Sequence, residues 1–344
     1  MRILKKIGVL LLTVHILFTG TTILLAEGEG WQFPGTNVGT PYVQYPLAGV
    51  MNIIHSVMTD TFNPWTHFRS DTWAVAVSIN YFDVETVIVM PDEGTDYDQT
   101  GKGDGFTGGS VSLRYNYALS DDWMIFGIYT GVFMKGKVIY NSPTQLSGGG
   151  YSPPDDRYVF DGPSQAHVGI LGLGYDFFNG PEWSFPIFVG GSILKYRSDL
   201  TISPLPGETG NPYMEMEADG ISYGIYVSLA ISRTLFSFLK ITPYITIHQL
   251  LNTPEGTVTV TGDNPSGPNA DFYIGNSATG EIGEEGYLGA GLNITYLGAG
   301  PLSYSISVSG IINSHTNFYN DAFHESLEMK SYSFSITYDT NFSE

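Results

Sequence analysis

From residue 73 onward, apolar and small polar side chains alternate along the chain in long segments. The clearest segment lies at the C-terminal end, where aromatic and aliphatic residues alternate with hydroxyl residues: Tyr332, Phe334, Ile336 and Tyr338 with Ser331, Ser333, Ser335 and Thr337. A period of two places these sets on opposite faces of a β-strand. The pattern predicts an amphipathic strand with one apolar face and one face of small polar groups.

The same period predicts about ten amphipathic strands. Their expected ranges are Trp73–Met90, Phe106–Leu119, Trp123–Tyr140, Gln165–Phe178, Trp183–Thr201, Glu217–Thr234, Leu239–Leu251, Ile282–Leu297, Leu302–Ser314 and Leu327–Thr340. Tight turns and long loops alternate between them. The turns fall at 120–122, 179–182, 235–238 and 298–301, and the loops at 91–105, 141–164, 202–216, 252–281 and 315–326. This alternation predicts an antiparallel meander with short turns at one end and long loops at the other.

The expected fold class is all-β, a closed antiparallel up-and-down transmembrane β-barrel over residues 73–344, with a short helix before it. A soluble β-sandwich is the alternative, since its strands also have one apolar face. The polar face of a sandwich meets water and usually carries Lys, Glu and Thr, whereas here serine occupies every second position from Ser303 to Ser309. Such small side chains favour an enclosed interior, and the long strands are natural for tilted membrane strands.

The aromatic-rich closing strand, with Phe342 two residues from the end of the chain, resembles the closing strand of bacterial outer-membrane β-barrels. The resemblance implies the outer membrane of a diderm bacterium, with both termini in the periplasm and the long loops outside the cell. It also implies outer-membrane lipids and the barrel-assembly machinery as partners. Aromatic residues near the short turns are interpreted as one interfacial girdle: Trp73, Trp123, Trp183, Tyr296, Tyr304 and Tyr338. Buried aromatic residues at the strand starts of a soluble protein are the alternative.

The N-terminus is interpreted as a signal peptide over residues 1–26, since Lys5 and Lys6 precede an apolar run. An uncleaved membrane anchor is the alternative. After Ala26 no segment offers about 18 uninterrupted apolar residues, which excludes an α-helical membrane protein. Residues 27–72 form a separate segment in which apolar residues recur at helical spacing: Leu47, Val50, Met51, Ile54, Val57 and Met58.

We expect this helix to plug the barrel, an organisation similar to the N-terminal hatch of FadL-type hydrophobic-compound channels. The similarity is architectural, because no shared motif transfers residues. A periplasmic helix that never enters the lumen is the alternative. The formal charge of −20 argues against nucleic acid as a partner, and the absence of cysteine excludes disulfides and thiolate metal sites.

Strand parity places Arg114, Tyr244 and His248 on the inner face as lumen-facing candidates. Arg114 is interpreted either as a lumen charge that selects ions or as a structural ion pair with an acid on a neighbouring strand. No catalytic residue is predicted, because no carboxylate or nucleophile can be assigned beside a histidine, and nothing matches the paired Asp and His-Asp unit of the ten-stranded omptin proteases.

The long loops are acidic, which favours solvated loops or a rim that concentrates cations. Asp96, Asp98 and Asp104 have EF-hand-like spacing, so calcium is a weak candidate ligand, although Thr107 stands where a bidentate Glu is needed. No other cofactor is expected. The sequence therefore predicts a porin-like channel for passive transport or uptake of small, including hydrophobic, solutes. The alternatives are a structural or adhesive surface barrel without a pore and, third, an outer-membrane enzyme.

Overall fold

The computed structural model describes residues 72–89, 99–142, 155–178, 180, 182–204, 214–251, 255–263, 277–281, 286–298, 300–313, 315–318 and 323–341. Within those ranges no helix is long and apolar enough to cross a membrane. The expected signal segment, the N-terminal helix with its six plug positions, and Asp96 and Asp98 lie outside the described residues. Asp104 lies in a strand, but its side chain is not among those described.

Fifteen strand segments make up the described fold. They are β1 Thr72–Val89, β2 Gln99–Ala118, β3 Trp123–Ser142, β4 Asp155–Asp176, β5 Trp183–Ser184, β6 Pro186–Pro204, β7 Met214–Ala230, β8 Ser232–Leu235, β9 Leu239–Leu250, β10 Glu255–Asp263, β11 Ser277–Glu281, β12 Gly286–Leu297, β13 Leu302–Asn313, β14 His315–Phe318 and β15 Phe323–Asn341.

Five interruptions divide ten barrel strands into these segments. Both β7 and β8 pair with β9, and both β9 and β10 pair with β7. Likewise β5 continues β6, β11 continues β12, and β13 and β14 both pair with β15. The ladder holds at the breaks, since Ile231 N–H donates to the Pro243 carbonyl and Leu251 N–H to the Tyr223 carbonyl.

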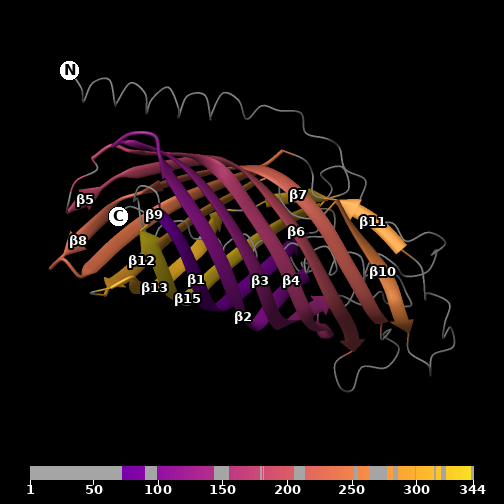
Figure 1. Cartoon of the computed structure of the whole chain (residues 1–344). Helices are drawn as coiled ribbons and strands as arrows, with labels where there is room; N and C mark the ends of the chain where they lie inside the picture. Colours follow the sequence, from indigo (N-terminus) through magenta and orange to yellow (C-terminus); the bar gives the residue numbers. More distant parts are fainter. Residues whose placement is uncertain are drawn as a thin grey trace.

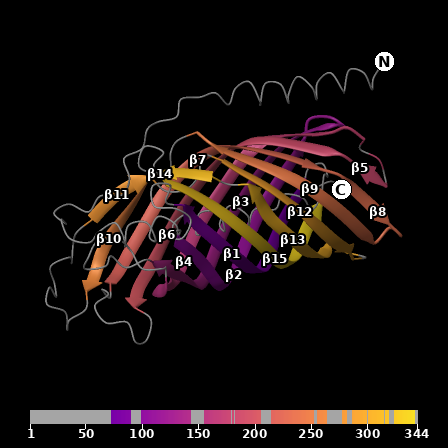
Figure 2. The same ribbon diagram turned by 180° about the vertical axis from the view of Figure 1, so that it is seen from behind.

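The ten strands close into one antiparallel barrel. The circle runs β1-β2-β3-β4-β6-β7-β9-β12-β13-β15 and returns to β1, which pairs with both β2 and β15. Figures 1 and 2 show the tilted strands from opposite sides, with β5 and β8 at one end of the barrel and β10 and β11 at the other. The expected closed barrel of about ten strands is confirmed, and the two stacked sheets of a sandwich are excluded.

The strands extend further into the expected loops than the sequence pattern indicates. Strand β2 begins at Gln99 and β4 at Asp155, and β10, β11 and β14 lie wholly in expected loops. These extensions are rich in glycine, threonine and charged residues, so their apolar alternation is short, as at Val258 and Val260 of β10. Backbone hydrogen bonding continues where sustained hydrophobic alternation stops, and a strand without that alternation leaves no clear signal in the sequence.

The outer wall of the barrel is apolar and the inner wall largely polar. On β1 the outward residues Trp73, Val75, Val77, Ile79 and Tyr81 are all exposed, Ile79 by 69%. The inward residues between them on the same strand are half-buried or buried. This inverts the arrangement of a water-soluble protein and is the pattern of a barrel that spans a membrane.

The six aromatic residues of the expected girdle all lie exposed near the short-turn end. Trp73 of β1 pairs with Tyr115 of β2, which pairs with Gly127 of β3. Gly127 lies four residues beyond Trp123, so the tryptophan position shifts by four residues over two strands, or two per strand. The same line of register pairs continues from Gly127 through Leu171 to Gly191 of β6, four strands from Trp73. Trp183 on β5 lies eight residues before Gly191, which is again a shift of two residues per strand. A constant shift along tilted strands places these rings at one height around the barrel.

The short turns are tight, as expected. In the turn from β8 to β9, Phe236 and Ser237 both have positive φ, 55° and 62°, and Phe238 N–H donates to the Leu235 carbonyl. Two consecutive positive φ values match the twist of a two-residue hairpin. The Phe236 and Phe238 rings stack at 5.9 Å, and Phe238 also contacts Tyr296. Aromatic rings therefore continue around the short-turn end.

Candidate functional site: a serine-lined lumen

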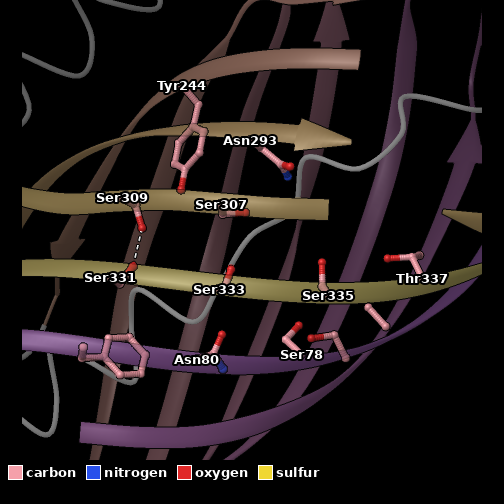
Figure 3. Close-up of a pocket in the computed structure, with 13 residues that line it drawn as sticks. Ser78, Asn80, Tyr244, Asn293, Ser307, Ser309, Ser331, Ser333, Ser335 and Thr337 are labelled. Atoms are coloured by element: carbon pink, nitrogen blue, oxygen red, sulfur yellow. Dashed lines mark hydrogen bonds between the residues drawn. The ribbon is translucent and has the colours of Figure 1, made fainter. Parts of the chain in front are cut away.

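Small hydroxyl side chains cover one side of the lumen. On β13 the inward residues are Ser303, Ser305, Ser307 and Ser309, and on β15 they include Ser331 and Thr337. Figure 3 shows the β15 residues in a row, with Ser78 and Asn80 of β1 on one side and the β13 serines on the other. The three adjacent strands β13, β15 and β1 therefore line this side of the lumen mostly with small side chains.

A cavity of about 50 Å³ lies against this wall, enough for a few water molecules. Its lining is mostly hydroxyl and amide side chains with a few apolar groups: Ala76, Ser78, Asn80, Phe82, Ser112, Tyr244, Asn293, Ser307, Ser309, Ser331, Ser333, Ser335 and Thr337. None of these side chains carries a formal charge. A solute in the cavity would meet groups that both donate and accept hydrogen bonds.

Cross-strand hydrogen bonds organise the hydroxyl wall. Ser309 and Ser331 lie 2.6 Å apart between their Oγ atoms, and the Thr295 and Ser305 hydroxyls are 2.9 Å apart. On the other side of β1, the Ser112 and Thr130 hydroxyls are separated by 2.8 Å. Each pair joins neighbouring strands, so the lining is held in place while hydroxyl rotation leaves it adaptable.

Bulky inward residues occupy other parts of the inner wall, and several of them lie over a glycine of the next strand. A Cβ added at Gly291 would meet the Tyr244 ring, and one at Gly220 would meet the Tyr196 ring. Gly174 likewise lies beneath Met124 and Phe188. These rings lie along the wall instead of across the lumen. In Figure 3 the Tyr244 hydroxyl end points toward β13, so this ring borders the cavity.

His248 contacts Ser192 across an intervening strand. Its Nε2 atom lies 2.6 Å from Ser192 Oγ, and both side chains are buried. Gly224 of β7 lies between them, and a Cβ there would approach His248 Nε2 to 2.5 Å. The glycine therefore permits a contact between β6 and β9, which are not neighbours in the barrel.

Arg114 makes a similar contact near the short-turn end. Its Nη2 atom lies 3.6 Å from Asp339 Oδ1, and both side chains are nearly buried. Ala74 of β1 pairs with both residues, so the ion pair crosses the strand that joins β2 to β15. The acid is two strands away from Arg114 and not on an adjacent strand. The pair places opposite charges together on the inner wall.

The three lumen candidates from the sequence are all buried. Tyr244 lines the cavity, whereas Arg114 and His248 are not among its lining residues. Sequence reasoning did not assign Asp339 or Ser192, the partners of Arg114 and His248. Strand parity could have placed both on the inner face, but register across two strands was needed to pair them. Among the described residues, no group of three His, Asp or Glu side chains could hold a metal ion.

No protein-family model matches the chain, and no curated protein matches it. Its fold is similar to the outer membrane protease OmpT from Escherichia coli, with 10% identity, 80% of this chain and 99% of that chain covered, and a TM-score of 0.48. It is also similar to the CymD monoaromatic hydrocarbon channel, with 9% identity, coverage of 93% and 95%, and a TM-score of 0.33. A FadL homologue of Pseudomonas aeruginosa is similar with 10% identity, coverage of 78% of this chain and 90% of that chain, and a TM-score of 0.32. At these values no residue role passes from them to this chain.

Proposed function

We propose that this chain is an outer-membrane barrel that conducts water and small uncharged polar solutes passively along its hydroxyl wall. The observation that carries the proposal is the cavity, whose lining combines serine, threonine, asparagine and tyrosine side chains without a formal charge. An ion in such a narrow neutral passage would lose hydration without gaining an opposite charge. A neutral solute with hydroxyl or amide groups would exchange its hydrogen bonds to water for hydrogen bonds to hydroxyl and amide groups of the lining.

The outer wall supports membrane embedding. From Trp73 to Tyr81 the five outward side chains of β1 are all apolar or aromatic. Eight residues extend about 26 Å along a strand, or about 20 Å along the axis at a tilt near 40°. This height, bounded by aromatic residues at both ends, fits the apolar band of an outer-membrane barrel. The plug stays a prediction, as do the periplasmic termini and the extracellular loops.

Liposome swelling tests the proposed permeation. We expect the full mature chain to admit glycerol and urea, and Ser307→Phe to reduce the rate to near that of protein-free liposomes, because the new ring would enter the cavity. Val308→Phe is the matched control, since Val308 is the next residue and lies exposed on the outer wall. Background flux through the unchanged barrel would contradict a channel and favour a structural barrel.

The Arg114–Asp339 pair provides a second expectation for ion leakage. Arg114→Met would leave the Asp339 carboxylate without this guanidinium, so we expect the reversal potential in a salt gradient to shift toward cations. Asp339→Asn should shift it toward anions by the converse argument. Equal reversal potentials in the two variants, measured in planar bilayers, would show that the pair lies away from the conducting path.

A further inference from the structure

Two lysines and a glutamine form a row on the outer wall, just beyond its apolar band. Lys135 lies on β3, Gln165 on β4 and Lys195 on β6, and both lysines are exposed. Lys135 pairs with Pro163, two residues from Gln165, and Gln165 pairs with Arg197, two residues from Lys195. The row therefore shifts by two residues with each strand, as the tryptophan positions do, and runs parallel to them around the barrel.

The row lies at the height of lipid headgroups. Lys135 is twelve residues beyond Trp123 on β3, and Lys195 is twelve residues beyond Trp183 along β5 and β6. Twelve residues span about 40 Å along a strand, or about 30 Å along the axis at the usual tilt. That is about 5 Å more than the apolar band of an outer-membrane barrel, which is about 25 Å tall, so the row lies just past the band. With the tryptophans at the inner interface, the two ammonium groups reach the outer one.

The nearby acids already contact other basic residues. Lys137 lies 3.8 Å from Asp161, and Arg197 lies 2.9 Å from Glu217 and 3.7 Å from Asp199. No ion pair of Lys135 or Lys195 is present among the side chains that the structure describes. In a chain of net charge −20, these two exposed ammonium groups lie close together on the outer wall, two strands apart, and can meet one external anion.

The wall beside the row is shallow and polar enough to receive a headgroup. Gly191 lies four residues before Lys195, is exposed, and would have nothing within 4 Å of an added Cβ. His167 pairs in register with both Gly131 and Lys195, and its Nδ1 atom lies 2.7 Å from the Tyr129 hydroxyl. Imidazole, amide and ammonium groups thus border a surface that a flat molecule can approach closely.

We infer that this row binds an outer-leaflet glycolipid that carries two phosphate groups on a disaccharide, one phosphate at each lysine. The Cα atoms of Lys135 and Lys195 are separated by two strand spacings and four residues, about 16 Å. Flexible lysine side chains adapt to phosphates at the two ends of a disaccharide across that span. The inference rests on the membrane embedding proposed above and is independent of solute flux.

Native mass spectrometry of the folded full mature barrel in detergent tests the site, with synthetic bisphosphoryl lipid A as the probe. We expect lipid A to bind more tightly than its monophosphoryl form or phosphatidylglycerol. The Lys135→Gln, Lys195→Gln double variant should weaken lipid A binding roughly 25-fold, since each lysine near an anionic lipid surface contributes about fivefold. Lys330→Glu is the matched control, because it changes the net charge equally on β15, outside the row.

Unchanged lipid A affinity in the double variant would overturn the assignment, as would equal loss in the Lys330→Glu control. Equal binding of phosphatidylglycerol and lipid A by the unchanged barrel would also overturn it, because two paired phosphates would then give no advantage. Electrophoretic mobility before and after heating confirms that each variant is folded. Liposomes for the swelling assay contain no lipid A, so a closed lumen and an absent glycolipid site give separate results.

Discussion

Gly172→Ala is expected to destabilise the folded barrel by about 3 kcal/mol, near the upper end of overpacking costs. A Cβ at Gly172 would meet the Val189 carbonyl oxygen and come to 2.6 Å from the Gly190 Cα, and both obstacles are backbone atoms of the paired strand β6. Side-chain rotation cannot relieve such a contact. Urea titration in detergent micelles, followed by the heat-dependent shift in electrophoretic mobility, measures the free energy of unfolding.

Gly131→Ala on the adjacent strand β3 is the control for that variant. A Cβ there meets nothing within 4 Å, so we expect unchanged stability or a gain of about 0.5–1 kcal/mol from the lower entropy of the unfolded chain. The comparison separates a steric cost from the general effect of replacing glycine in a strand. Equal losses in both variants would mean that β4 and β6 do not approach each other at Gly172 as the structure has them.

Val77→Arg is expected to destabilise the barrel by about 2–4 kcal/mol in lipid bilayers, because Val77 lies midway along the apolar band of β1. Tyr81→Arg, four residues further at the edge of that band, should cost about 0–1 kcal/mol. Reversible folding into phospholipid vesicles, followed by tryptophan fluorescence, measures both. Both side chains are already exposed, so water around the barrel would make the two substitutions nearly equal. A depth-dependent difference is the signature of hydrocarbon against the outer wall.

Hydrophobic alternation identified the ten strands and the closed barrel because the apolar band imposes a period of two on every strand that crosses it. Turn chemistry located the short connections, and serine at alternate positions from Ser303 to Ser309 indicated the bare side of the lumen. These features are local and can be seen in single segments. The antiparallel order of neighbours follows from them once consecutive strands are joined by tight turns.

Contacts that cross an intervening strand were beyond the sequence pattern. The pairing of Arg114 with Asp339 and of His248 with Ser192 depends on register across β1 and β7, where Ala74 and Gly224 leave room. Parity gives the face of a residue but not its height relative to strands elsewhere in the chain. The cavity lining could not be predicted for the same reason, since it combines residues of β1, β9, β12, β13 and β15 with Ser112 of β2.

The join between β1 and β15 has a consequence for biogenesis. These strands are paired from Thr72 with Asn341 to Val89 with His324. The first and the last barrel strands to be synthesised therefore share one ladder of hydrogen bonds. Until the final strand is synthesised, the amide and carbonyl groups along that border of β1 have no native partner, and such a border recruits other chains. Closure of the barrel is thus postponed until β15 has been made, and the waiting polypeptide needs protection from self-association on its way to the membrane.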